Sequence, residues 1–119
     1  MEALYNLNGQ ATAYIYEDGK HIYLYNGNPV GFIRDNNIYS YSGRYLGWIF
    51  NGWFYDRLGR PAFFTVNSTG GPSKPSRKAK PTRSARKARP AKAAREARPA
   101  KPARSVYWSN FVDEAYFAQ

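Results

Sequence analysis

Side chains able to perform acid–base, nucleophilic or metal chemistry are scarce in this chain. Its 119 residues include one histidine, no cysteine and eight acidic residues. His21 follows the Asp18-Gly19 turn, where an exposed imidazole at a strand end is expected. Asp35 and Asp56 also lie in or beside turns, where aspartate bonds its own backbone. No spacing of His, Asp and Glu is typical of a metal site, so we expect a non-catalytic protein without cofactor or metal.

Basic side chains are the one kind of functional group that is concentrated in the sequence, and they occupy a single stretch. Residues 71–105 contain thirteen Lys or Arg and one acid, Glu96, for a net charge of +12, whereas the other 84 residues carry −2. Such a field attracts phosphate groups, on a nucleic acid backbone or on an anionic membrane surface. The candidate polyanion-binding residues are Lys74, Arg77, Lys78, Lys80, Arg83, Arg86, Lys87, Arg89, Lys92, Arg95, Arg98, Lys101 and Arg104.

The composition of this stretch also limits how it could bind. It contains no aromatic or large aliphatic residue, so bases have nothing there to stack on, and contact to backbone phosphate without sequence specificity is expected. A nine-residue period is set by four prolines, Pro72, Pro81, Pro90 and Pro99. Helices that fit between them are too short to be stable in water. We therefore predict that residues 71–104 are extended and disordered; a merely solubilising loop is the alternative.

All 21 aromatic residues lie outside the basic stretch, in a repeated pattern. Four segments align on Gly9, Gly27, Gly43 and Gly59, at spacings of 18, 16 and 16 residues. In the first three units a polar turn follows, and then an apolar-Tyr pair. The turns are Asp18-Gly19, Asn36-Asn37 and Asn51-Gly52, and the pairs are Ile22-Tyr23, Ile38-Tyr39 and Phe54-Tyr55. Each unit therefore predicts a strand, a tight turn and a second strand.

Hairpins of this size are marginal alone, so the units must pair into one nearly closed sheet. The predicted fold is all-β: a small pseudo-four-fold barrel of about four hairpins and eight strands. Alternation of tyrosine with aliphatic residues in 13–16 and 22–25 places the two kinds on opposite faces. Gly31 and Gly47 each follow their anchor by four residues, and we expect these positions to leave no room for a side chain.

The fourth unit has no short turn after Phe63–Val66, because the basic stretch follows instead. We predict that the returning strand is Ser105–Phe111, with Val106-Tyr107 in place of the apolar-Tyr pair. The domain would then comprise residues 1–70 and 105–119, interrupted by the disordered insert 71–104. A short C-terminal helix is expected within Phe111–Phe117.

These motifs together resemble a known bacterial family. Gly-x-x-x-Gly-aromatic-Ile segments, Asn-Gly or Asp-Gly turns and Ile-Tyr or Phe-Tyr pairs, best matched over Gly43–Tyr55, are similar to the four-fold beta-flower domain proteins. The resemblance covers essentially the whole chain, including the basic insert and the Trp-Ser tail. It implies a shallow, pseudo-symmetric barrel of radiating hairpins, and the architectural likeness of that barrel to the tubby barrel suggests lipid binding by analogy of fold.

A second hypothesis takes the aromatic repeats as the binding surface. The segment Gly47–Tyr55 resembles the aromatic repeats of choline- and glucan-binding modules, and exposed rings stack on sugars or enclose quaternary ammonium groups. The candidate residues are Trp48, Trp53 and Tyr55. The ligand would be a small molecule, a lipid or a glycan. Core packing of the same rings is the alternative, and a purely structural or assembly module with a solubilising loop is a third hypothesis.

The sequence also bears on compartment. No N-terminal segment has the charge and apolar run of a secretory signal, and no apolar stretch is long enough to span a membrane. The absence of cysteine suits a reducing environment. We expect a cytoplasmic protein, for which the sequence does not specify an oligomeric state.

Overall fold

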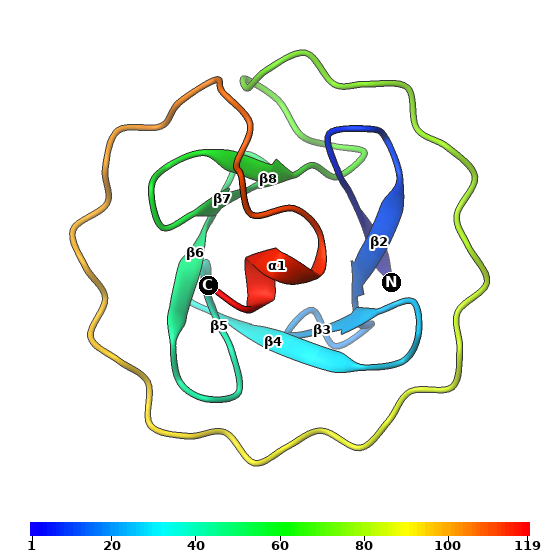
Figure 1. The fold of residues 1–119 in the computed structure, drawn as a ribbon, viewed down its shortest axis with the longest axis vertical. Helices are drawn as coiled ribbons and strands as arrows, with labels where there is room; N and C mark the ends of the chain where they lie inside the picture. The colour runs from blue at the N-terminus through cyan, green and yellow to red at the C-terminus, as the bar shows by residue number, and fades with distance from the viewer.

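Eight short antiparallel strands follow one another in chain order around a central axis in the computed structural model, which describes all 119 residues (Figure 1). The strands are β1 (Glu2–Tyr5), β2 (Ala11–Ile15), β3 (His21–Leu24), β4 (Pro29–Arg34), β5 (Asn37–Tyr39), β6 (Tyr45–Phe50), β7 (Trp53–Asp56) and β8 (Pro61–Phe63). Each is hydrogen-bonded to the next. Tyr5 and Phe64 exchange two backbone hydrogen bonds of 2.9 Å, which bring β1 against the end of β8. The predicted all-β, pseudo-four-fold barrel is confirmed.

The strand that completes the fourth hairpin is not the one predicted. Residues 105–111 contain no strand, and Val106 and Tyr107 are 62% and 75% exposed. β1 occupies that position, so Leu4-Tyr5 supplies the apolar-Tyr pair that the fourth unit lacks. β1 takes this position because Leu4 points into the core and is fully buried. Residues 105–111 do not alternate apolar with outward-facing side chains in this way.

The turns of the second and third units follow the chemistry expected of tight hairpins, with one shift, whereas in the first unit only Gly19 of the predicted Asp18-Gly19 pair has positive φ. Asn51 and Gly52 both have positive φ, as a type I′ turn requires. In the second unit the two positive-φ residues are Asp35 and Asn36, so this turn lies one residue earlier than the predicted Asn36-Asn37. Asn37 is instead the first residue of β5.

The two faces of the sheet carry different side chains, as the alternation predicted. Aliphatic residues such as Ile22, Ile38 and Leu46 fill the inside of the barrel and are fully buried. The outer face carries most of the tyrosine and tryptophan rings, which form a second buried cluster. We call this outer cluster the aromatic girdle; its buried members are Tyr5, Phe32, Tyr39, Tyr41, Tyr45, Trp48, Trp53, Tyr55 and Phe64, with Ala3 and Ala11.

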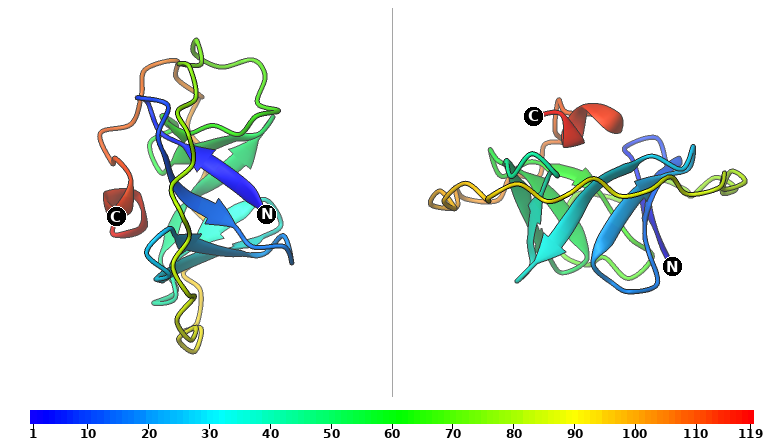
Figure 2. Two further views of the ribbon diagram at one scale, coloured as in Figure 1. Left: turned by 90° about the vertical axis from the view of Figure 1, so that its right-hand side faces the viewer. Right: turned by 90° about the horizontal axis from the view of Figure 1, so that it is seen from below.

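A single helical turn, α1 (Glu114–Phe117), covers one end of the barrel (Figure 2). Tyr116 is fully buried and donates a 2.8 Å hydrogen bond from its hydroxyl to the Tyr55 carbonyl. The two glycines predicted to lack space lie beneath this cap. A Cβ on Gly47 would lie 2.7 Å from the Tyr116 hydroxyl oxygen, and one on Gly31 would lie 3.5 Å from the Phe117 ring and 2.8 Å from the Tyr39 carbonyl oxygen.

The expectation of a disordered insert is not supported. Residues 72–104, which we call the belt, follow one extended path around the outside of the barrel and return to α1 (Figures 1 and 2). The extended, helix-free conformation is as predicted. Disorder is expected of the belt sequence because it has no aromatic or large aliphatic residue with which to form a core, but the barrel supplies a surface for it instead.

Candidate polyanion-binding belt

The belt is attached to the barrel at four equivalent points, one for each hairpin unit. At each point a backbone N–H at or just beyond the belt donates a hydrogen bond of 2.8–2.9 Å to the carbonyl of an anchor glycine. The four bonds run from Lys78 to Gly9, from Lys87 to Gly27, from Glu96 to Gly43 and from Ser105 to Gly59. The donors are nine residues apart, so the period marked by the prolines is the step that carries the belt from one hairpin unit to the next.

The anchor glycines are required by both the turn and the belt. Gly43 has a φ of 90°, and a Cβ there would lie 1.9 Å from the carbonyl oxygen of Ala94 in the belt. The other three anchors repeat this arrangement, again with positive φ and with belt carbonyls nine residues apart. A side chain at any of them would therefore strain the turn and lift the belt from the barrel.

Beneath the belt, the outer face of the barrel presents four stacked pairs of rings, three from the aromatic girdle and one, Tyr14–Tyr23, beside it. Each pair joins neighbouring strands, with ring centroids 5.4–5.9 Å apart. The pairs are Tyr5–Phe64, Tyr14–Tyr23, Phe32–Tyr39 and Trp48–Tyr55. They come from equivalent positions of the four units, so the outside of the barrel offers the belt the same aromatic surface four times.

Belt cations lie over these rings in two series, each with a nine-residue step. The first series places Arg83, Lys92 and Lys101 at 5.5, 4.5 and 5.7 Å from the centroids of Tyr14, Phe32 and Trp48. The second places Arg77, Arg86 and Arg95 at 5.9, 5.9 and 5.7 Å from Tyr5, Tyr23 and Tyr39. Each exposed contact of this kind contributes about 0.5–1 kcal/mol. The cations thus hold the belt in register as well as giving it charge.

Glu96, the only acid in the belt, marks one unit as different from the others. Its carboxylate accepts a hydrogen bond from the Tyr45 backbone N–H and lies 4.0 Å from the Arg57 guanidinium. Tyr45 stands two residues after its anchor, where the second and fourth units have Pro29 and Pro61, which have no N–H. The first unit has Ala11 at this position and keeps its N–H, so Glu96 pairs with one of two such N–H groups and distinguishes the third unit of a nearly symmetric barrel.

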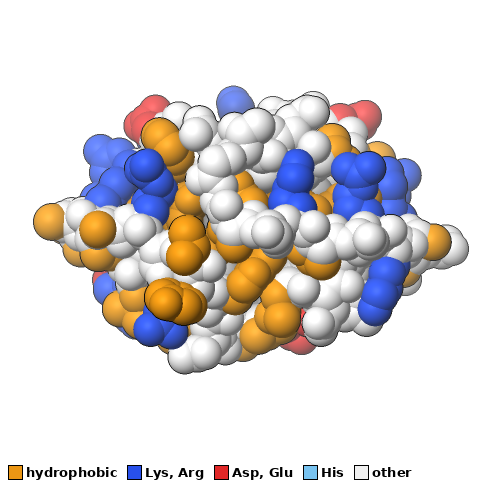
Figure 3. Space-filling model, turned by 90° about the horizontal axis from the view of Figure 1, so that it is seen from above, with side chains coloured by type: hydrophobic (Ala, Val, Ile, Leu, Met, Phe, Trp, Pro, Cys, Tyr) orange, Lys and Arg blue, Asp and Glu red, His pale blue; other side chains and the backbone are white.

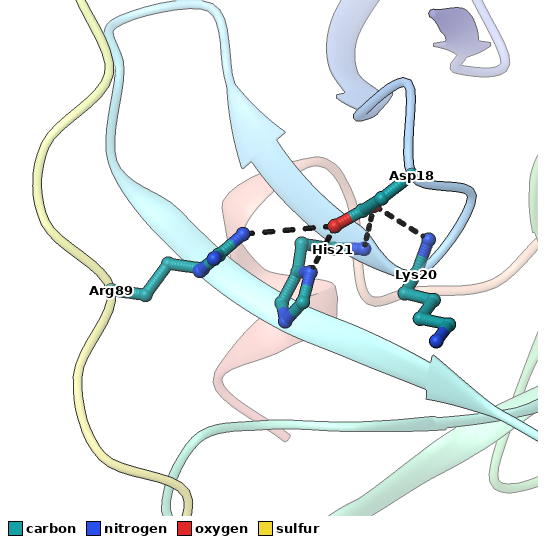
Figure 4. Close-up of polar contacts among 4 residues, drawn as sticks. All are labelled: Asp18, Lys20, His21 and Arg89. Atoms are coloured by element: carbon teal, nitrogen blue, oxygen red, sulfur yellow. Dashed lines mark hydrogen bonds and ion pairs between the residues drawn. The ribbon is translucent and has the colours of Figure 1, made fainter.

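The belt is also joined to the first unit by an ion pair at the turn before β3 (Figure 4). An Asp18 carboxylate oxygen lies 3.7 Å from the Arg89 guanidinium and 2.6 Å from Nδ1 of His21. Partial burial alone would raise the pKa of Asp18, but hydrogen bonds from the Lys20 amide and from His21 lower it to about 2. Asp18 is therefore ionised at neutral pH.

The histidine and the turn aspartates make structural contacts at turns. The expectation of an exposed imidazole is wrong, because His21 is only 9% exposed and is bonded to Asp18. Asp56 is fully buried and accepts hydrogen bonds from the Leu58 and Arg60 amides and from the Ser109 hydroxyl. No group of three or more His, Cys, Asp or Glu residues is placed to hold a metal ion.

All thirteen candidate basic residues are exposed on the rim of the molecule. Figure 3 shows one side of this rim, where Lys and Arg side chains gather along both edges of the belt. Nine of the thirteen contact the barrel: the six over the rings, Arg89 at Asp18, Lys74 at the Ser68 carbonyl and Arg104 over Phe50. The four whose side chains make no hydrogen bond, ion pair or ring contact are Lys78, Lys80, Lys87 and Arg98; we call these the free cations.

The alternative aromatic residues lie inside the structure. Trp48, Trp53 and Tyr55 are only 3%, 1% and 1% exposed. Lys101 covers Trp48, and a Cβ on Gly71 would lie 2.4 Å from the Trp53 ring. These rings therefore present no open surface to a sugar or an ammonium group while the belt is in place.

Sequence reasoning missed the cation–ring register between belt and barrel. The signal was a match of numbers: four prolines divide the belt into nine-residue repeats, and four glycine anchors divide the barrel into hairpin units. Neither repeat alone indicates that the belt contacts the barrel. The equal number of repeats does indicate such contact, because both ends of the belt are joined to the same barrel.

A sequence model described as 4-fold beta flower protein matches residues 2–117. No curated protein and no solved structure matches the chain. None of its helices has the length and apolar character needed to cross a bilayer.

Proposed function

This chain belongs to the 4-fold beta flower protein family, and we propose that its belt binds phosphate-bearing polyanions without sequence specificity. The observation that carries the proposal is the continuous exposure of thirteen basic residues on a fixed path around the rim. The proposed role is non-catalytic.

Charge spacing supports a continuous binding surface. From Lys74 to Arg104, no basic residue is more than three residues from the next along the belt. Three extended residues span about 10 Å, and the Debye length at 0.1 M salt is also about 10 Å. The fields of neighbouring cations therefore overlap, and an anion at any point along the belt lies within range of at least one of them.

The ring contacts also favour binding, because they hold cationic groups in place beforehand. Arg86 lies 4.4 Å from the Tyr16 centroid as well as 5.9 Å from that of Tyr23, and it remains exposed. A guanidinium stacked on a ring keeps N–H donors at its edge for a phosphate. Since its rotamer freedom is already reduced, ordering it on binding costs less.

Contact to phosphate is favoured over contact to bases. The rings of the girdle lie beneath the belt, and the belt itself has no aromatic residue. Bases therefore lack a stacking platform along the cationic path, and the expected contacts position a backbone without reading its sequence.

The test removes charge while leaving the belt attached. A variant with glutamine at the four free cations, Lys78, Lys80, Lys87 and Arg98, keeps every ring contact. We expect it to lose retention on heparin and affinity for DNA, with a weaker dependence on salt. The matched control exchanges Lys for Arg and Arg for Lys at the same positions, and it should bind like the original chain. Unchanged binding of the glutamine variant would contradict the proposal.

A further inference from the structure

We infer that the ligand of the belt is a flexible, single-stranded phosphate chain that follows the rim, rather than a rigid duplex or a flat membrane. This inference rests on the proposed function and specifies its substrate class. It is drawn from the shape of the cationic path and not from the amount of charge.

The free cations point to a ligand that bends, because they are distributed around the molecule. Lys78 and Lys87 stand at the first and second anchor points, and Arg98 lies between the third and the fourth. The molecule is 37 by 36 Å across and 22 Å thick, and the belt runs along its wide circumference (Figures 1 and 2). A flat surface that approaches the rim edge-on can touch the cations of one arc only, and one that approaches face-on meets α1 or the hairpins before the belt (Figure 2).

A stiff polyanion meets the same restriction. Duplex DNA has a persistence length of about 50 nm, many times the 37 Å width of the protein. A duplex would therefore touch one arc of the belt and leave the other cations unpaired. An anionic bilayer would likewise meet one arc, unless it curved around a protein smaller than its own thickness, about 40–45 Å with head groups.

A single strand has no such restriction. It can follow the belt with its phosphates turned inward and its bases turned to solvent, since the belt provides no ring for them. Near β1 the belt also stands away from the barrel, leaving a hollow of about 520 Å³ lined by Met1, Tyr25, Lys80 and Arg83 among others. A phosphate entering this hollow would meet two cations, Lys80 and Arg83, from adjoining repeats of the belt.

The experiment compares phosphate-bearing ligands of different stiffness, using the full chain, by the number of phosphates neutralised on each. Oligothymidylates of increasing length, duplexes of the same lengths and phosphatidylserine vesicles are titrated at several salt concentrations. We expect affinity for the single strand to rise with length and to level off once the strand spans the belt. The slope of log affinity against log salt concentration is about −0.7 per phosphate neutralised for a single strand and about −0.9 for a duplex. The number of phosphate contacts obtained from these slopes should be larger for the single strand than for the duplex.

Two charge variants test whether the contacts run around the whole rim. One replaces Lys78 and Lys80 with glutamine, and the other replaces Lys87 and Arg98. A long strand should lose about two phosphate contacts with either variant and about four when both are combined.

The outcomes separate the two proposals. Equal contact numbers for duplex and single strand, or preferential binding of vesicles, would overturn the inference while leaving polyanion binding intact. A loss confined to one of the two variants would also overturn it, because the strand would then occupy one arc. If no polyanion binds, the proposed function fails and the inference fails with it.

Discussion

The barrel and the belt are ordered by different physical means. The barrel buries its own side chains, and Leu4, Ile22 and Ile38 are completely removed from solvent. Every belt residue from 76 to 104 is exposed, yet six backbone hydrogen bonds tie residues 78–105 to the barrel. Order in the belt therefore depends on a partner surface. A segment that cannot form a core of its own can therefore be ordered when its sequence repeat matches the structural repeat of the domain that it lies against.

The largest expected loss of stability comes from a substitution that affects the packing of the barrel and leaves the belt unchanged. Tyr116→Ala empties a fully buried site under the end cap and removes the hydrogen bond to the Tyr55 carbonyl. Truncating a large buried ring costs about 3–5 kcal/mol, which we expect to appear as a lower free energy of unfolding in urea. Tyr116→Phe, the control, keeps the ring and should cost about 1 kcal/mol. Equal losses in the two variants would contradict this packing role.

A second substitution tests the contact between the regions. Gly43→Ala places a Cβ against the Ala94 carbonyl and strains a turn residue of positive φ, and such strain costs about 1–3 kcal/mol. The same substitution in a chain whose residues 72–104 are replaced by Asn-Gly should cost less, because the belt carbonyl is absent. The two costs, measured by urea unfolding, form a double-mutant cycle. If they are the same, the belt does not rest on Gly43.

Alkaline pH should weaken the tyrosine-rich girdle. Burial raises the pKa of Tyr41 to about 12, and burial likewise raises the pKa of Tyr25, Tyr45 and Tyr55. Groups whose pKa is raised by folding stabilise the folded state below their unfolded pKa of about 10. That stability is lost as pH rises from about 10 towards 12. Thermal unfolding followed across this range should show a falling midpoint, and a constant midpoint would contradict the burial of these phenols.

The smallest expected effect concerns the register of the belt. Glu96→Lys removes the acceptor for the Tyr45 N–H and makes the third repeat resemble the first two. We expect a loss of about 0.5–1.5 kcal/mol and faster amide hydrogen exchange at Tyr45. Glu96→Gln keeps an acceptor oxygen and should show a smaller change. Slow exchange at Tyr45 in the lysine variant would mean that Glu96 does not fix the register.

The barrel was predictable because its signals are local. Turn residues such as Asn51-Gly52, and the alternation of tyrosine with aliphatic residues in 22–25, indicate hairpins and their buried faces directly. The closing strand was not predictable in this way. Leu4-Tyr5 precedes the first anchor glycine and so lies outside the four aligned units, and only the Tyr5–Phe64 bridge shows that it completes the fourth unit.

The order of the belt depends on contacts between distant parts of the chain, and its own sequence does not encode them. Arg83 lies over Tyr14, and the Lys87 amide bonds Gly27, across separations of about sixty or seventy residues. The thirteen basic residues of the candidate site could be identified from charge alone. Their arrangement into cations over rings and free cations could not, because it depends on which side chains the barrel turns outward.

Amide hydrogen exchange along the belt is the direct measurement of whether the belt is held on the barrel at the four anchor glycines. The N–H groups of Lys78, Lys87, Glu96 and Ser105 each donate to an anchor glycine. We expect slowed exchange at these four positions, repeating every nine residues, with faster exchange at the belt residues between them that have no acceptor. Exchange at the rate of an unstructured peptide at all four positions would contradict this expectation.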